Sequence, residues 1–158
     1  MMKVFFLGLC LACLSFAADG PLPEYILGEY KYESSENYDE FLTDLGLNWF
    51  TRQIIQSVNP RITISQGGGK IKLTLGSSLF SSTSEFELGV PFMEKDPRGG
   101  NVPAIATFAG NSLKKVLTPT EDPAYTEIRT FTENGKRMTV TLSVVGSPIT
   151  ATRYFQKV

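Results

Sequence analysis

The chain has 158 residues, 42% of them apolar and 20% charged, which suits one folded domain and excludes a disordered tail. Its formal charge is −1, from 15 Lys and Arg against 16 Asp and Glu, so nothing in its charge favours binding to nucleic acid. It contains no histidine, which removes the commonest general base and transition-metal ligand and argues against an enzyme, a cofactor or a metal site.

The first seventeen residues have the layout of a secretory signal peptide. Lys3 gives a basic start, and residues 4–14 are uncharged and mostly apolar. Ser15 and Ala17 then place small residues three positions and one position before a possible cleavage site. A retained membrane anchor is the alternative, but this apolar run is shorter than the roughly twenty residues that span a bilayer. We expect cleavage after Ala17 or Ala18 and a secreted protein.

Cleavage there removes both cysteines of the chain, Cys10 and Cys13. The mature domain, residues 18–158, then has no thiol and forms no disulfide. We expect it to be stabilised by apolar burial and backbone hydrogen bonds, which its length allows.

The first elements predicted in the mature chain are a strand and a helix. Residues 25–33 are rich in β-forming side chains and predict the strand. Asn37 and Glu40 have the spacing of a capping box, and Gly46 is expected to end the helix that follows. Helical spacing predicts an apolar face on this helix made of Tyr38, Phe41, Leu42 and Leu45.

A second short helix is predicted to begin near Asn48 and to end at Asn59-Pro60. Phe50, Ile54 and Val58 follow one another at intervals of four residues and would share one face. We therefore expect Phe50 to face inward and its neighbour Trp49 to face outward.

The remainder of the chain predicts strands and turns. Residues 61–66 and 70–75 alternate between apolar and polar side chains, and turn signals recur about every ten residues. Among these signals, Asn134-Gly135 is the strongest for a two-residue hairpin. The pattern favours an all-β fold: a ten-stranded antiparallel up-and-down barrel with a two-helix lid, with a β-sandwich as the alternative.

A barrel of ten strands is too wide for side chains alone to fill, which predicts an internal ligand cavity. Residues 137–145 alternate apolar side chains with the hydroxyls of Thr139, Thr141 and Ser143. Two interpretations stay open for these hydroxyls, because they suit either a hydrated cavity wall or the solvent face of a sheet.

Residues 28–42 (GEYKYESSENYDEFL) carry the pattern Gly-x-aromatic, a short acidic stretch, and Asn-aromatic-acid followed by two apolar residues. This pattern resembles the opening of the fatty-acid-binding protein family, the intracellular lipid-binding proteins. The likeness continues through residues 46–56, 60–65 and 83–89, and it resumes at 150–157. The resemblance implies a calycin-like barrel of ten strands, capped by two helices, that binds one long-chain fatty acid.

Three features narrow the resemblance. The family is normally cytosolic, yet this chain begins with a signal-peptide pattern; residues 113–129 make a longer connection than usual; and Trp49-Phe50 opens the second helix. Together they resemble the secreted nematode subgroup of the family.

The resemblance also implies residues for the fatty-acid carboxylate, which the family holds with Arg-x-Tyr near the C-terminus and a second arginine about twenty residues earlier. Arg153 matches the first arginine, with a purely structural role as the alternative, and Phe155 replaces the tyrosine and its hydroxyl. Thr130 falls at the place of the second arginine. Arg129, one residue away, would face outward unless a β-bulge intervenes.

We expect the portal and lid to include Trp49, Phe50, Ile54 and Leu79. Only Leu79 is placed there by the resemblance, and ordinary packing is the alternative. Exposed aromatic side chains there would suit transient contact with membranes or a protein acceptor. We expect a monomer.

Rival classes fit less well. No Gly-x-Ser-x-Gly motif occurs, and without histidine no Ser-His pair can form. A lipocalin would open with Gly-x-Trp where this chain has Gly28-Glu29-Tyr30. A structural or storage protein of extracellular fluid remains an alternative, as does a retinoid in place of the fatty acid.

Overall fold

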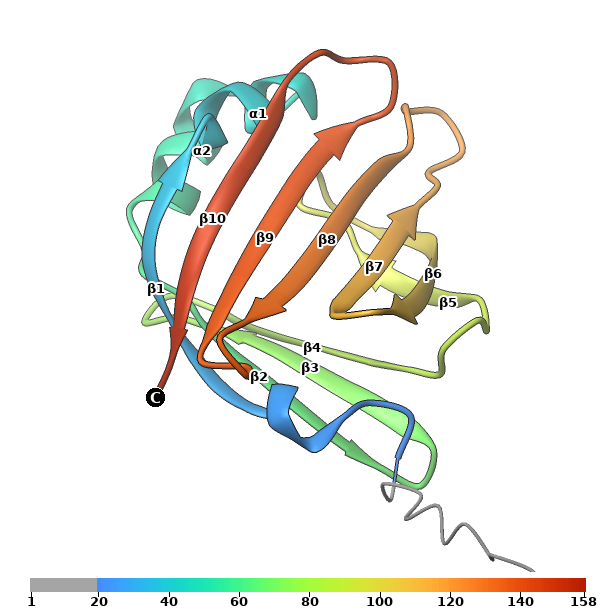
Figure 1. The fold of residues 1–158 in the computed structure, drawn as a ribbon. Coiled ribbons are helices and arrows are strands. Elements are labelled where there is room, and N and C mark those ends of the chain that lie inside the picture. Colours follow the sequence, from blue (N-terminus) through green and yellow to red (C-terminus); the bar gives the residue numbers. More distant parts are fainter. Residues whose placement is uncertain (1–19) are drawn as a thin grey trace, which may run out of the picture.

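The computed structural model describes residues 20–158, so the expected signal peptide, residues 1–17, lies outside the described residues. Ten antiparallel strands form one sheet that rolls into a nearly closed barrel (Figure 1), in the order β4-β3-β2-β1-β10-β9-β8-β7-β6-β5. The strands are β1 (Gly28–Glu36), β2 (Arg61–Gly67), β3 (Lys70–Gly76), β4 (Ser81–Phe86), β5 (Phe92–Lys95), β6 (Asn101–Ala109), β7 (Ser112–Leu117), β8 (Tyr125–Thr132), β9 (Arg137–Val144) and β10 (Thr150–Lys157). Helices α1 (Tyr38–Asp44) and α2 (Trp49–Gln56) cover one end, which confirms the predicted barrel and lid.

The barrel is incomplete only between β4 and β5, which do not pair through their backbones in the sheet of residues 20–158. Side chains join them instead. Ser84 on β4 donates a hydrogen bond to Glu94 on β5, and the rings of Phe86 and Phe92 stack with centroids 4.8 Å apart. These contacts hold the two edges together where the backbone ladder is missing.

The first strand begins three residues later than predicted. Glu24–Ile26 form a short 3₁₀ helix (η1), and the strand starts at Gly28. Ile26 is buried, and the Lys157 ammonium donates to the carbonyl of Tyr25 at 2.8 Å. The β-forming side chains of this segment therefore pack in a turn that closes the base of the barrel, where burial outweighs strand propensity.

The first helix begins and ends where predicted, but the capping box is wrong. Asn37 adopts φ 55° and ψ 25°, a left-handed conformation, and its side chain makes no cap hydrogen bond. Its Nδ2 instead donates to the carbonyl of Thr150, 3.2 Å away on β10. Gly46, with φ 85°, ends the helix as expected.

The hairpin between β8 and β9 has four loop residues, 133–136, rather than two. Glu133 and Asn134 both have positive φ, and a Cβ atom at Gly135 would lie 1.9 Å from the carbonyl oxygen of Tyr25. Glycine is thus required at 135 both by its own φ of 80° and by close contact with η1.

The apolar core follows the inward faces of the strands. On β3, Ile71 and Leu73 are buried and Leu75 is half-buried, as the alternation predicted. On β9, Met138, Val140, Leu142 and Val144 are the buried set. The hydroxyls of β9 are on the opposite face, where Ser143 hydrogen-bonds Thr126 of β8, so they do not line the cavity. This decides between the two interpretations left open by the sequence.

No helix formed by residues 20–158 is long and apolar enough to cross a membrane.

Candidate functional site

The barrel encloses a cavity of about 410 Å³ beneath the two helices. This volume is within the range of small-molecule sites, and the walls are mostly apolar, as such sites require. The apolar side chains come from both helices and from β2, β3 and β9, and they include Phe41, Leu42, Ile62, Leu73, Val140 and Leu142. The charged and hydroxyl groups on this wall therefore decide what the cavity can hold.

Arg153 reaches the cavity from the inner face of β10, between Ala151 and Phe155. Its guanidinium carbon lies 4.3 Å from the ring centre of Tyr38, 5.1 Å from that of Tyr32 and 5.6 Å from that of Phe155. Cation–π contacts of this kind orient an arginine without neutralising its charge.

The guanidinium has spare donor capacity. Nη1 donates a long hydrogen bond of 3.4 Å to the Tyr38 hydroxyl, whereas Nε is buried and without a partner. No carboxylate within residues 20–158 forms an ion pair with Arg153. Arg153 is half-buried, and a cation partly withdrawn from water without a counter-ion suits an anionic ligand.

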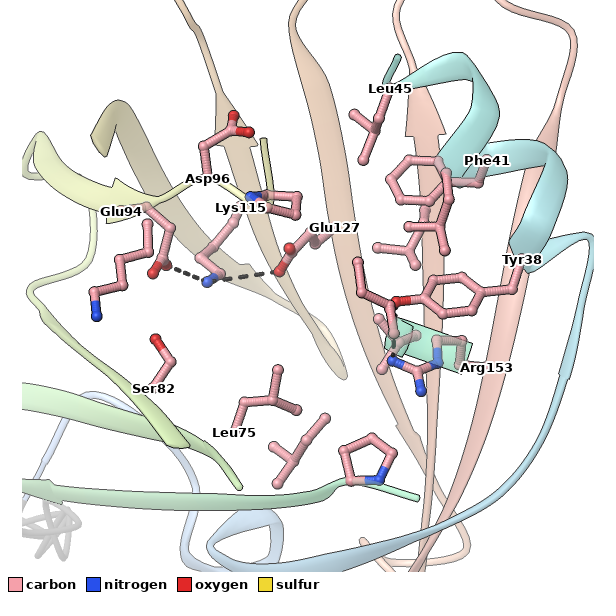
Figure 2. A pocket seen from close by; sticks show the side chains of 18 of the residues that line it. Tyr38, Phe41, Leu45, Leu75, Ser82, Glu94, Asp96, Lys115, Glu127 and Arg153 are labelled. Atoms are coloured by element: carbon pink, nitrogen blue, oxygen red, sulfur yellow. Dashed lines mark hydrogen bonds and ion pairs between the residues drawn. The ribbon is translucent and has the colours of Figure 1, made fainter. Parts of the chain in front are cut away.

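Tyr38 supplies a hydroxyl beside Arg153 that sequence reasoning did not anticipate. Phe155 has no hydroxyl. The Tyr38 side chain instead projects from the first turn of α1 toward the same guanidinium (Figure 2). Burial raises the pKa of Tyr38 more than the nearby Arg153 lowers it, so the phenol stays protonated and can donate. The sequence assigned Tyr38 only to the apolar face of its helix.

Arg129, not Thr130, lines the cavity. The register pairs Phe131 with Met138 and Arg129 with Val140, so both phenylalanine and arginine face inward without a bulge. Thr130 faces outward and hydrogen-bonds Ser112 at 3.0 Å. The expected orientation of this pair was wrong, because Arg129 and Phe131 lie opposite Val140 and Met138 of the buried face of β9 and so share the inward face of the barrel.

Arg129 already has a counter-ion. Its Nη1 donates to Glu127 Oε2 at 3.0 Å, and Lys115 Nζ lies 3.5 Å from the same oxygen. Lys115 also forms a close ion pair with Glu94, which accepts a hydrogen bond from Ser84. Figure 2 shows the ammonium of Lys115 between the two carboxylates. We call Glu94, Lys115, Glu127 and Arg129 the wall network.

The wall network holds its charges in place. Burial raises the pKa of Glu127, but attraction to Lys115 and Arg129 outweighs burial and lowers this pKa to about 2. Lys115 itself is only 3% exposed. Glu127 is therefore ionised at neutral pH and neutralises part of the positive charge on this wall.

Sequence reasoning missed Glu94, Lys115 and Glu127. One signal was present, since Lys115 lies between Leu113 and Leu117 on the alternating inner face of β7. A lysine at such a position needs a buried partner. The partners themselves come from β5 and β8, and only the folded sheet brings them together.

The residues predicted to form the portal are all exposed: Trp49 by 66%, Phe50 by 67%, Ile54 by 42% and Leu79 by 65%. The expectation that Phe50 faces inward was wrong, because Thr51, Ile55 and Val58 form the face of α2 and its following turn that lines the cavity. Next to Leu79, Phe80 takes the place on the cavity wall. The predicted residues thus lie outside the cavity, beside residues that line it.

Comparison with curated proteins finds fatty acid-binding proteins. The chain is 34% identical over 130 residues to a fatty acid-binding protein of Tyrophagus putrescentiae, covering 82% of this chain and 95% of that protein. It is 30% identical over 131 residues to a 14 kDa fatty acid-binding protein of Schistosoma mansoni, covering 83% and 96%. No protein-family model matches the chain.

Comparison with solved structures also finds fatty acid-binding proteins. A fatty acid-binding protein from the brain of Drosophila melanogaster superposes with a TM-score of 0.75 at 31% identity, covering 83% of this chain and 98% of that one. A Schistosoma mansoni fatty acid binding protein in complex with arachidonic acid gives a TM-score of 0.78 at 26% identity, covering 85% and 97%.

Proposed function

Because the chain belongs to the fatty-acid-binding protein family, we propose that it binds one long-chain fatty acid inside the barrel and carries or buffers it. Membership makes it a lipid-binding protein and not an enzyme. The observation that carries the proposal is Arg153, a cation without a carboxylate partner among residues 20–158, in a mostly apolar cavity. The arachidonic acid complex of the Schistosoma mansoni protein supports a fatty acid as the ligand.

The energetics fit this ligand. An acyl chain of about fifteen methylenes gains roughly 12 kcal/mol at most from complete burial, reduced by several kcal/mol when the chain is immobilised. The carboxylate would be penalised in the same cavity unless a cation and hydrogen-bond donors receive it. Arg153 offers Nε and its terminal nitrogens, and the Tyr38 hydroxyl adds a donor beside them.

Between the two arginines, Arg153 is the better anchor. The charge of Arg129 is engaged by Glu127 at 3.0 Å, so a carboxylate there would also meet a fixed negative charge. We therefore assign the head group to Arg153 and Tyr38 and leave Arg129 in the wall network.

Displacement of a fluorescent fatty acid from delipidated residues 18–158 tests the proposal, with oleate, methyl oleate and retinol as competitors. We expect full displacement by oleate at one ligand per chain and weaker competition by the uncharged ester. If only retinol displaces the probe, the ligand is a retinoid and not a fatty acid. Failure of all three with a folded barrel would refute the proposal.

We further propose that the protein is secreted after cleavage behind Ala17 or Ala18 and belongs with the secreted nematode members of the family. The signal-peptide pattern and the β7–β8 connection support this. The connection is residues 118–124 rather than the expected 113–129, because β7 and β8 take up both ends of that range. Arg98, on the turn between β5 and β6, lies 3.5 Å from Asp122 in that connection. Expression in a secreting cell and N-terminal sequencing of the medium test it; an uncleaved chain kept inside the cell would contradict it.

Transfer of the fatty acid is proposed to involve the exposed side chains Trp49, Phe50, Ile54 and Leu79, which lie beside cavity-lining residues of α2 and the β3–β4 turn. Apolar side chains at such a rim suit brief contact with a membrane or an acceptor protein. The carrier is proposed to act as a monomer, which sedimentation of the delipidated chain would test.

A further inference from the structure

The wall network and Arg153 are on different parts of the same cavity. Figure 2 shows Glu94, Lys115 and Glu127 on one side and Arg153 with Tyr38 on the other. Arg129 and Arg153 pair with the same residue of β9, Val140, from the two neighbouring strands. Two strand spacings put their Cα atoms about 10 Å apart, so one ligand can reach both.

The wall network has no net charge to offer a second anion. It contains two carboxylates, from Glu94 and Glu127, and two cations, from Lys115 and Arg129. Each cation has a carboxylate within ion-pair distance. A second carboxylate would gain little attraction here and would be repelled by two fixed negative charges.

The network nevertheless has unused hydrogen-bonding capacity. Arg129 is only 6% exposed, and its Nε is buried without a partner. Such groups are nearly always satisfied by protein, water or ligand. Glu127 makes both of its ion pairs through Oε2, which leaves Oε1 available to accept a hydrogen bond.

We propose that the wall network is a second polar site, which receives a hydroxyl group carried by the acyl chain of the bound fatty acid. A hydroxyl is neutral, and it can accept from Arg129 Nε while donating to a carboxylate oxygen of the network. The preferred ligand is therefore a hydroxylated long-chain fatty acid, with its carboxylate at Arg153 and its hydroxyl at the wall network. This inference rests on the proposed function, since it assumes the carboxylate at Arg153.

The alternative is that the network only fastens the barrel near its open edge, where Ser84 of β4 meets Glu94 of β5, and that water satisfies Arg129. The two possibilities differ in ligand preference. In an apolar cavity a ligand hydroxyl without a hydrogen-bond partner weakens binding roughly tenfold or more. A hydroxyl that hydrogen-bonds to charged side chains recovers this affinity.

The test compares matched acids by displacement from the wild-type protein: ricinoleate and 10-hydroxystearate against oleate and stearate. We expect at least one hydroxylated acid to bind about threefold or more tightly than its parent. Both hydroxylated acids binding about tenfold more weakly, or no better than their parents, would overturn the second site while leaving the fatty-acid carrier intact. Failure of oleate and stearate to bind would instead refute the proposed function.

A charge-neutral double variant, Glu127→Gln with Arg129→Met, separates ligand recognition from stability. It removes one cation and one anion and keeps the Lys115–Glu94 pair. We expect oleate affinity to change less than about threefold, while the preference for the hydroxylated acid is lost. Thr130→Val, on the outer face of the same strand, is the matched control and should alter neither. If the double variant does not fold, the wild-type comparison alone decides.

Discussion

Replacing Arg153 with methionine tests how the cavity recognises a carboxylate. Methionine retains much of the length and apolar bulk of the arginine stem, so packing against Tyr32, Tyr38 and Phe155 is disturbed as little as possible. What is lost is the charge and the donors of the guanidinium. Leaving one member of a buried ion pair alone costs about 3–5 kcal/mol, which corresponds to more than a hundredfold in affinity.

The assay is displacement of a fluorescent fatty acid by oleate and, in parallel, by methyl oleate. We expect Arg153→Met to weaken the binding of oleate by about a hundredfold or more and the binding of methyl oleate by less than about threefold. Arg61→Met, which removes an arginine from an exposed ion pair with Glu29, is the control and should leave both ligands unaffected. Equal losses for the acid and the ester would remove Arg153 from the head-group site, and no loss for either would place the carboxylate elsewhere.

Four further predictions concern the cavity and its rim. Tyr38→Phe should weaken oleate about tenfold and leave methyl oleate nearly unchanged in the same displacement assay, because a donor to the charged group is lost; equal effects would assign Tyr38 to packing. Phe155→Tyr should leave oleate affinity unchanged or raise it, and abolished binding by a folded variant would contradict the account of the missing hydroxyl. Trp49→Ala should slow transfer of a fluorescent fatty acid to vesicles with nearly unchanged equilibrium affinity, whereas a large affinity loss would mean that Trp49 supports the cavity. The lowered pKa of Glu127 contributes stability above pH 4.5 that is lost as the pH falls toward 2, so denaturant unfolding of wild type should lose about 3 kcal/mol more over that interval than Glu127→Gln, and parallel slopes would contradict it.

The parts of the fold that could be predicted are those with short-range patterns. Strands β2 and β3 alternate strictly, Gly46 ends a helix by its own conformation, and Asn134-Gly135 lies in a tight loop. Each depends on residues within a few positions of one another, so the sequence alone carries the information.

The features that could not be predicted from the sequence depend on contacts between residues far apart in the chain. Tyr38 meets Arg153 across 115 positions of the chain, and the partners of Lys115 come from two other strands. The inward face of α2 was misjudged because Phe50 and Ile54 are as apolar as the Ile55 that packs inside. Helical spacing groups apolar residues on a face, but only the tertiary fold decides which face is covered.

A crystal structure of residues 18–158 with oleate tests the central claim most directly. The account predicts one acyl chain inside the barrel, with its carboxylate about 3 Å from the Arg153 guanidinium and from the Tyr38 hydroxyl. A carboxylate bound to Arg129 with the Glu127 ion pair broken, or an acyl chain bound outside the barrel, would contradict it.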